Sequence, residues 1–326
     1  MAAVTGASGF VGTNLLQRLH DDGWTVRAVV RRPPGGAAAA LAEARLVDDI
    51  RDQPQLQDAF EGADVVFNLA ARISLFTDDR DIWDINVNGP RAVGRAALAC
   101  GVGRLVHCSS VHAFDVSLAR GRVDERCPRS TSPERPIYDR SKAAGEAALR
   151  TVIDEGLDAV VVNPTGIIGP VDPGPSRANR LLRLAARGRL PFVLAGGFDW
   201  VDVRDVALAM IAALERGGTG ENYLVPGHRM SSLELSRMAA RAGGHRGPLA
   251  EVSLDVAARL APLGNRVGRW LGSDILTPAS VGALRDDPVV DGTKAASELG
   301  YSPRPLERTV TDLVASFSTS TQRVPV

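Results

Sequence analysis

Apolar and polar positions follow two rhythms along the first half of this chain. Short β-rich apolar runs alternate with longer segments in which apolar residues recur at helical spacing. The expected strands lie at 2–5, 25–30, 45–47, 64–69, 104–108 and 159–163, and the expected helices at about 10–22, 54–61, 79–99 and 138–155. Strands that alternate with helices predict βαβ units, and therefore an α/β fold built on a Rossmann-type, doubly wound parallel sheet.

The rhythm changes after residue 163. Prolines at 164, 170, 173 and 175 interrupt the next stretch, and a helix with several arginines is expected at about 177–188. We expect residues 1–165 to form the first domain and residues 166–326 to form mainly a smaller, helix-rich lobe. Segments within 192–225, a strand and helix at 200–214 and a strand at 222–225, are expected to complete the first sheet.

Composition narrows the function classes. The 38 basic and 38 acidic residues give a formal net charge of zero, so no overall field favours nucleic acid or an anionic membrane as a partner. The three cysteines form no C-x-x-C and the five histidines show no metal-ligand spacing, so we expect neither a disulfide framework nor a metal site. Without a basic leader or 18 consecutive apolar residues, the sequence predicts a cytoplasmic protein.

Two residues of scarce types stand one helical turn apart. The chain has three tyrosines and two lysines, and Lys142 follows Tyr138 by four positions in an expected helix. Residues four apart share a helix face, so this spacing sets an ammonium beside a phenol. The positive charge is expected to lower the pKa of Tyr138 from its usual value of about 10 and to fit the phenol for proton transfer near neutral pH.

A glycine-rich turn joins the first expected strand to the first expected helix. Residues 5–12 read Thr-Gly-Ala-Ser-Gly-Phe-Val-Gly, with the glycines at G-x-x-G-x-x-G spacing. Glycine permits a tight turn and a close backbone approach, while the helix N-terminus offers N–H groups to a pyrophosphate. The turn therefore predicts a dinucleotide site made by Gly6, Ser8, Gly9, Phe10, Val11 and Gly12.

The end of the second expected strand indicates which dinucleotide is bound. A carboxylate at this place would bind the ribose 2′-hydroxyl of NAD, but the sequence has Arg31 and Arg32 instead. Two guanidiniums suit a 2′-phosphate, which they can bind through charge-assisted hydrogen bonds. We therefore favour NADP(H) over NAD(H); the alternative is that both arginines are simply solvated.

These motifs together resemble the extended short-chain dehydrogenase/reductase family, also called the NAD-dependent epimerase/dehydratase family. The matching segments are 5–12, Asp49-Ile50, 68–71, 86–89, Cys108-Ser109-Ser110, 138–142, 163–170, 200–207 and 298–301. The closest likeness is to the dihydroflavonol-4-reductase-like branch. Segment 198–203 departs from the sugar-nucleotide epimerases, because it lacks the arginine and histidine that they usually carry there.

The resemblance implies roles for the catalytic candidates. Tyr138 would give a proton to a carbonyl oxygen while NADPH delivers hydride, and Lys142 would also hydrogen-bond the nicotinamide ribose. Ser110 would bind the substrate oxygen; Ser109 is its rival, since only one of two adjacent side chains can face the cleft. Asn86 would either support a proton relay or bend its helix.

The resemblance also implies further binding residues. Asp49 and Ile50 would flank the adenine, and Pro164 and Ile167 would lie beside the nicotinamide. The other cofactor candidates, in the fourth-strand motif, are Leu69, Ala70 and Ala71. Ordinary loop polarity or core packing is the alternative for these positions.

Segments after the carboxyl ends of strands are expected to line the substrate pocket. The candidates are Ile73, Leu75, Phe76, Val111, His112 and Ser176. Their apolar character favours a bulky, uncharged ketone or aldehyde, with His112 as a polar neighbour rather than a second acid or base. A row of arginines at helical spacing could receive an anionic group, although a solvated helix face is the better interpretation: Arg177, Arg180, Arg183 and Arg187.

The leading hypothesis is an NADP(H)-dependent carbonyl reductase or alcohol dehydrogenase that acts on a small molecule. A sugar or sugar-nucleotide epimerase or dehydratase is the alternative within the family. A dinucleotide-sensing regulator without catalysis is the alternative of another class, and the Tyr138–Lys142 pair argues against it. The Ala-rich helices at 79–99 and 138–155 fit a monomer or a homodimer.

Overall fold

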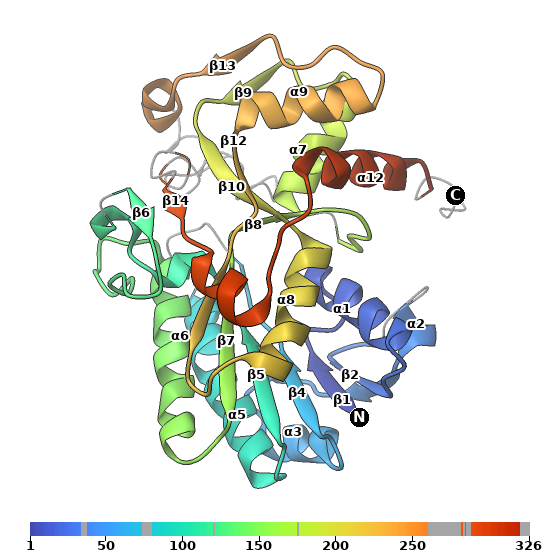
Figure 1. Cartoon of the computed structure of the whole chain (residues 1–326), viewed down its shortest axis with the longest axis vertical. Helices are drawn as coiled ribbons and strands as arrows, with labels where there is room; N and C mark the ends of the chain where they lie inside the picture. Colours follow the sequence, from blue (N-terminus) through green and yellow to red (C-terminus); the bar gives the residue numbers. More distant parts are fainter. Residues whose placement is uncertain are drawn as a thin grey trace.

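A seven-stranded parallel sheet forms the base of the molecule (Figure 1). The computed structural model describes residues 1–33, 38–73, 80–119, 121–174, 176–259, 282, 284 and 288–319. In spatial order the strands are β11 (Asn222–Val225), β7 (Ala159–Pro164), β5 (Arg104–Cys108), β4 (Val65–Asn68), β1 (Ala2–Thr5), β2 (Val26–Val30) and β3 (Glu43–Leu46). The strand order reverses at β1, which confirms the predicted doubly wound Rossmann sheet and places a ligand crevice beside its carboxyl end.

Helices cover both faces of this sheet. Helices α1 (Phe10–Asp21) and α8 (Val203–Arg216) pack on one face, and α3 (Gln53–Phe60), α5 (Gly89–Ala99) and α6 (Ile137–Asp154) pack on the other. Successive strand residues point to opposite faces, so Ala2 and Val4 join the core under α1 whereas Ala3 joins the core under α5. Burial on both faces explains why these strands are almost continuously apolar.

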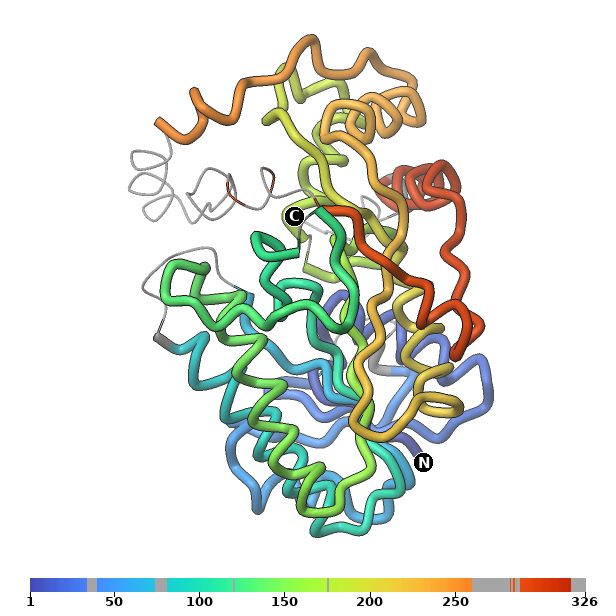
Figure 2. Tube along the Cα trace, turned by 60° about the vertical axis from the view of Figure 1, so that its left-hand side comes forward, coloured from blue at the N-terminus to red at the C-terminus, as the bar shows by residue number. Residues whose placement is uncertain are grey.

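The second lobe sits over the carboxyl edge of the sheet (Figures 1 and 2). Helices α7 (Arg177–Ala186), α9 (Ser232–Ala242) and α12 (Leu306–Thr319) share a core with the sheet formed by β12 (His228–Ser231), β10 (Gly197–Asp202) and β8 (Gly166–Ile168). Two parallel strand pairs complete the described sheets: β13 (Ala250–Val252) with β9 (Phe192–Leu194), and β14 (Val289–Val290) with β6 (Arg122–Val123).

The chain returns to the large sheet after it has entered the second lobe. Strand β11 pairs with β7, and α8 packs on the face that α1 also covers. Strands β9 and β10 instead belong to the small sheets, so of the strands expected within 192–225 only β11 completes the large sheet. The backbone pairing partners, which local sequence does not reveal, separate β11 from β9 and β10.

The helix expected at 79–99 is present from residue 80 to residue 99 and contains a π-helical turn. Helix α4 (Arg80–Trp83) passes into a π-helical turn over Asp84–Asn88 before α5 begins. The carbonyl oxygen of Asn86 lies against Gly145 of α6, where a Cβ would stand only 2.1 Å away. The Asn86 side chain is bonded elsewhere, to the main chain of Arg72 and to Ser141. Such π-turns often occur at functional sites.

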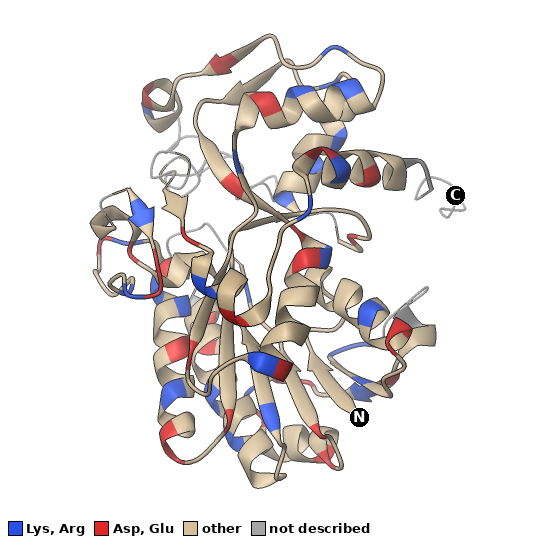
Figure 3. Ribbon diagram, in the orientation of Figure 1, with Lys and Arg blue, Asp and Glu red and all other residues tan. Residues whose placement is uncertain are grey.

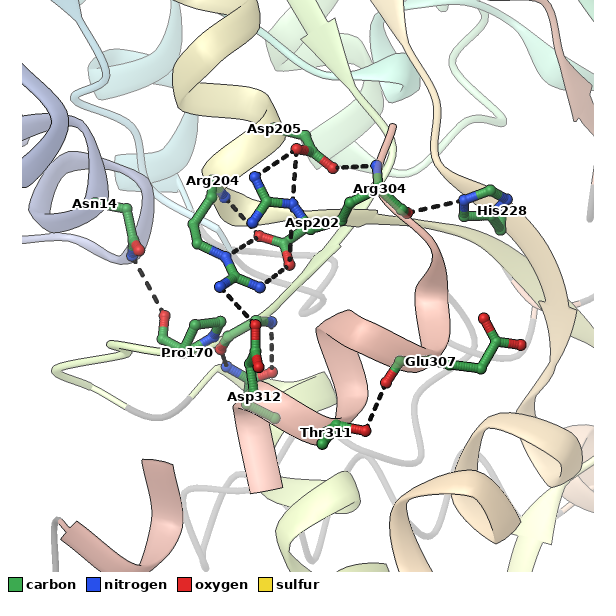
Figure 4. Close-up of polar contacts among 12 residues, drawn as sticks. Asn14, Pro170, Asp202, Arg204, Asp205, His228, Arg304, Glu307, Thr311 and Asp312 are labelled. Atoms are coloured by element: carbon green, nitrogen blue, oxygen red, sulfur yellow. Dashed lines mark hydrogen bonds and ion pairs between the residues drawn. The ribbon is translucent and has the colours of Figure 1, made fainter. Parts of the chain in front are cut away.

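Ion pairs join the C-terminal helix to the start of α8 (Figure 4). Asp202 binds Arg204 through Oδ2 and Nη2 at 2.7 Å, and Arg204 Nη1 binds Asp312 of α12 at 2.7 Å. Asp205 binds Arg304, which precedes α12, at 2.7 Å. Asp202 also accepts a hydrogen bond from the Arg204 backbone N–H and so caps α8. Ion pairs therefore join the two lobes at this junction.

The cofactor-turn helix also touches the second lobe. Asn14 of α1 donates through Nδ2 to the carbonyl oxygens of Val171, at 3.0 Å, and Pro170, at 3.4 Å (Figure 4). Val171 has a φ of 56°, which is uncommon and costly for a β-branched residue. This hydrogen bonding holds the loop that leads into α7 against the helix that follows the glycine turn.

Charge is mixed over both lobes (Figure 3). Blue and red ribbon segments, which mark basic and acidic residues, are interspersed, in agreement with a net charge of zero. Within the described ranges, no helix is long and apolar enough to cross a membrane. The same part of the chain holds no group of three or more His, Cys, Asp or Glu residues that could bind a metal ion.

Candidate active site

The glycine turn forms a cradle of bare backbone at the carboxyl end of β1. Gly6 has a φ of 66°, a conformation that favours glycine. A Cβ on Gly12 would lie 2.3 Å from the Gly6 carbonyl oxygen, and one on Gly6 would lie 2.8 Å from the Ala70 nitrogen. Gly9 begins α1 without a side-chain cap, so the first N–H groups of the helix are not covered from within the turn. This arrangement fits a dinucleotide pyrophosphate.

The fourth-strand motif adjoins this cradle. Thr5 Oγ1 accepts a hydrogen bond from the Ala70 N–H at 3.3 Å and donates to Asn68 Oδ1 at 2.7 Å. Leu69 packs against the core under α1, whereas Ala71 is exposed. The structure therefore brings the glycine turn and the predicted residues 69–71 together at the crevice.

The predicted adenosine-side residues lie farther along the same edge. Arg31 and Arg32 follow β2 and are exposed. Asp49 binds Arg51, whose hydrogen bond lowers the pKa of that carboxyl group. Ile50 packs toward Gly89 of α5, where a Cβ would lie 3.2 Å from its side chain. These four predicted residues thus follow β2 and β3, beside the glycine turn in the sheet order.

Tyr138 and Ser110 meet at the carboxyl end of β5. Tyr138 lies in the first turn of α6, and the Ser110 side chain is close enough to its phenol to lower the pKa of Tyr138. Ser110 follows β5 and caps the short turn Val111–Ala113 by accepting a hydrogen bond from the His112 N–H at 3.2 Å. Ser109 Oγ is buried and has no hydrogen-bond partner in the described structure. Ser110 rather than Ser109 is therefore the serine that contacts the tyrosine.

The pKa of Tyr138 corrects the sequence-based expectation. Burial raises it to about 12, and the Ser110 hydrogen bond and the positive charge of Arg177 offset only part of this rise. The Lys142 ammonium, which the helical spacing was expected to set beside the phenol, donates to the Cys108 carbonyl oxygen at 3.2 Å. Desolvation outweighs the helical spacing here. Tyr138 is thus a neutral proton donor at physiological pH.

Lys142 is buried, and its neighbour His107 was not among the site residues predicted from the sequence. Burial lowers the pKa of its ammonium, and the same effect lowers the pKa of neighbouring His107 to about 3, so this imidazole is neutral. His107 Nδ1 is 3.1 Å from Asn68 Nδ2, which continues the hydrogen-bonded chain from Thr5. A polar residue at the carboxyl end of an apolar strand was the signal that could have identified Asn68 and His107.

Asn86 acts on Tyr138 through the backbone. Its Nδ2 donates to Ser141 Oγ at 3.0 Å, and Ser141 Oγ donates to the Tyr138 carbonyl oxygen at 2.7 Å. Its Oδ1 accepts from the Arg72 N–H at 2.8 Å. Together with the π-turn around it, this bonding supports the helix-bending alternative for Asn86.

An aromatic stack separates Tyr138 from the second lobe. The His112 ring meets the Tyr138 ring edge-on, with centroids 5.7 Å apart, and is stacked on Phe198 of β10 at 5.9 Å. His112 Nδ1 lies 3.3 Å from an oxygen of Asp139. A mostly apolar pocket continues from this stack and is lined by Val111, His112, Val116, Thr165, Phe198, Asp199, Pro288 and Val290. Phe198 and Val116 were not predicted, because they come from segments without a motif.

The other residues predicted to bind the substrate or the nicotinamide lie in different environments. Ser176 is the N-cap of α7, where its hydroxyl accepts a hydrogen bond from the Asn179 N–H. Ile73 is exposed, whereas Leu75 and Phe76 lie outside the described residues. Pro164 ends β7 and is buried, and Ile167 of β8 packs partly against the core under α1. Both stand at the carboxyl edge, as the resemblance implies.

The arginine row of α7 does not act as one surface. Arg177 is half-buried, and its charge reaches Tyr138. Arg183 lies over the Phe317 ring at 4.8 Å from the centroid. Arg180 and Arg187 are exposed. The solvated-face interpretation therefore holds for half of the row only.

Comparisons with known proteins agree with this geometry. The family model "NAD dependent epimerase/dehydratase family" matches residues 2–225. The chain belongs to this family. It is 32% identical to sterol demethylase protein B of Methylococcus capsulatus, over 96% of this chain and 97% of the relative. A dihydroflavonol 4-reductase-like protein of Synechocystis is 31% identical over 96% and 93%. These matches confirm the predicted family and branch.

The solved structure of gox2253 has the same fold. It superposes with a TM-score of 0.85 at 31% identity and covers 98% of both chains. Members of the family bind a nicotinamide dinucleotide, and the glycine cradle fits that cofactor. The protein is therefore an enzyme of the short-chain dehydrogenase/reductase superfamily.

Proposed function

We propose that this protein is an NADP(H)-dependent oxidoreductase that reduces a ketone or aldehyde, or oxidises the corresponding alcohol. The observation that carries the proposal is the contact between Tyr138 and Ser110 at the crevice beside the glycine cradle. Two hydroxyl groups converge there, and buried Lys142 lies one helical turn away. The arrangement supplies a proton donor, a hydrogen-bond donor and positive charge at one point.

Each residue has a separate role in carbonyl reduction. The bound dinucleotide supplies hydride to the carbonyl carbon. Ser110 and Tyr138 donate hydrogen bonds to the carbonyl oxygen, where negative charge develops, and the Tyr138 proton moves to that oxygen. The alcohol forms and a phenolate remains, which the positive charge of Arg177 stabilises until water returns the proton. Alcohol oxidation uses the same groups in reverse.

The preference for NADP(H) rests on Arg31 and Arg32. Both are exposed at the carboxyl end of β2, where a 2′-phosphate could reach them. In the double variant Arg31→Ala/Arg32→Ala we expect the KM for NADPH to rise about 10- to 100-fold, because charged hydrogen bonds contribute about 1.5–3 kcal/mol. The KM for NADH should change less than about twofold. Initial-rate kinetics with both cofactors measures the difference.

The matched control for this pair is Arg45→Ala. Arg45 is exposed on the neighbouring strand β3, where it binds Glu43 at 2.9 Å. Its removal takes away a nearby charge without touching the end of β2, so we expect both KM values to stay unchanged. Equal effects of the double variant on NADPH and NADH would overturn the preference for NADP(H).

The substrate we propose is bulky and largely apolar. The pocket beside Tyr138 is walled by Val111, Val116 and Phe198, and the relatives named above are a sterol demethylase component and a flavonoid reductase-like protein. In a panel of ketones, NADPH consumption should be faster with cyclic and aryl ketones than with small hydroxy-acid precursors. Cofactor that stays bound through purification, without net NADPH turnover, would instead favour an epimerase or dehydratase.

A further inference from the structure

Glu146 is a buried carboxylate directly below the proposed catalytic pair. It lies on α6 four residues beyond Lys142 and eight beyond Tyr138, so the three side chains follow one face of the helix. Only 8% of Glu146 is exposed. A carboxylate with so little water needs partners that satisfy both of its oxygens.

Those partners come from strands and a loop far apart in the sequence. Oε1 accepts a hydrogen bond from Asn163 Nδ2 at 2.6 Å, and Oε2 accepts one from Asn222 Nδ2 at 2.9 Å. Arg129 Nη1 lies 3.0 Å from Oε2, and its guanidinium rests on the Phe114 ring. The carboxylate therefore ties α6 to β7, to β11 and to the segment before α6.

One of these partners also holds Ser110. Asn163 Nδ2 donates to the Ser110 carbonyl oxygen at 3.0 Å as well as to Glu146. Asn163 is fixed in turn, because its Oδ1 accepts from Asn222 Nδ2 at 2.8 Å. The position of the Ser110 main chain is thus set by a cluster whose centre is Glu146.

We propose that Glu146 is a positioning residue that locks Ser110 against Tyr138 through Asn163 and supplies the counter-charge for Lys142. Small displacements of hydrogen-bond donors cost large factors in rate, so a rigid support behind Ser110 preserves its contact with the reacting oxygen. The negative charge of Glu146 also favours the ammonium form of Lys142, against the effect of burial. This inference rests on the proposed function for its kinetic part only.

The scarcity of lysine gives a direct test of the counter-charge. The chain contains only Lys142 and Lys294, so protein labelled with [15N]lysine shows two side-chain signals, and Lys294→Arg assigns them. In Glu146→Gln we expect the pKa of Lys142 to fall by about one unit, the size typical of a nearby opposite charge. The signal of Lys294, whose ammonium binds Glu221, serves as the internal reference in each variant.

Glu125→Gln is the matched control. Glu125 is also partly buried and accepts a hydrogen bond from the Leu224 N–H of β11 at 2.9 Å, but its hydrogen bond is to the edge strand rather than to the cluster that holds Ser110. We expect this variant to leave the pKa of Lys142 and the kcat unchanged within twofold. Glu146→Gln should lower kcat about 10- to 100-fold while the KM for NADPH stays within threefold.

Glu146→Asp separates the two effects and serves if Glu146→Gln fails to fold. Its charge should keep the Lys142 pKa near that of the wild type, whereas its shorter reach should release Asn163 and lower kcat. A Lys142 pKa in Glu146→Gln equal to that in Glu125→Gln, or a wild-type kcat in both Glu146 variants, would overturn the inference. Absence of ketone reduction by the wild type would instead overturn the proposed function, while the lysine titration still decides the role of Glu146.

Discussion

The catalytic edge and the lobe junction treat buried ionisable groups in opposite ways. At the edge, burial has the largest effect. It raises the pKa of Tyr138 to about 12 and lowers the pKa of Lys142, and so favours the neutral form of each group. At the junction, burial alone would raise the pKa of Asp202, but its hydrogen bonds with Arg204 outweigh that effect and lower it. Tyr138, which is proposed to exchange a proton, has few charged partners. Asp202, which helps to join the two lobes, has ion-pair partners for its carboxylate.

The largest expected effect lies at the edge. Tyr138→Phe removes the proton donor but keeps the ring that packs against His112. We expect turnover to fall at least about a thousandfold, within the range for losing a general acid, with little change in the melting temperature or in the Kd for NADPH. Steady-state kinetics, calorimetry and cofactor titration measure these three quantities. A fully active Tyr138→Phe enzyme would refute the assignment.

The second-largest effect is expected at the junction, where a variant should lose stability but keep its turnover. Asp202→Ala leaves Arg204 without its buried partner and uncaps α8, so the free energy of unfolding should fall by about 3–5 kcal/mol. Denaturant titration measures this loss. The kcat of the folded fraction should stay within about threefold of wild type, because Asp202 does not contact the catalytic groups.

Glu43→Ala is the control for Asp202→Ala. Glu43 binds Arg45 in an exposed pair, and its loss should cost less than about 1 kcal/mol. If the two variants were equally stable, the junction would not be held by its buried charge, and the contrast between the two regions would fail.

The smallest effect is a pH dependence at the edge. Because burial raises the pKa of Tyr138 to about 12, the phenol is protonated throughout the range from pH 6 to 9. Carbonyl reduction needs this form, so its kcat should be nearly flat there. Alcohol oxidation needs the phenolate, whose fraction rises about tenfold per pH unit below the pKa, and its rate should rise accordingly. Oxidation rates that are flat from pH 7 to 9 would contradict this assignment.

Most of the fold followed from local patterns. The strand expected at 104–108 coincides with β5. The helix expected at 10–22 is one residue longer than α1, and the helix expected at 138–155 is shifted by one residue from α6. These elements are strongly periodic, and each packs on one known face. The π-turn at Asp84–Asn88 was not predictable, because it depends on the contact between Asn86 and Gly145 of another helix.

The candidate site divides in the same way. Gly6, Gly12, Ser110, Tyr138 and Lys142 were identified, because each belongs to a motif in which neighbours in sequence are neighbours in space. Glu146, Asn163 and Asn222 were missed, because no motif joins an α6 carboxylate to amides on β7 and β11. Ser176 caps α7, and its contact with the substrate stays a prediction.

The sequence by itself determined the element types, the family and the cofactor turn, since periodicity and short-range spacing are properties of the local chain. Only the tertiary structure decided that Ser110 rather than Ser109 meets Tyr138, and that the pKa of Tyr138 rises. The physical reason is desolvation: a pKa depends on how much water the fold removes and on which charges it leaves nearby. Those quantities are set by residues on other elements, such as Ser110 and Arg177 around Tyr138, and no spacing within one helix reveals them.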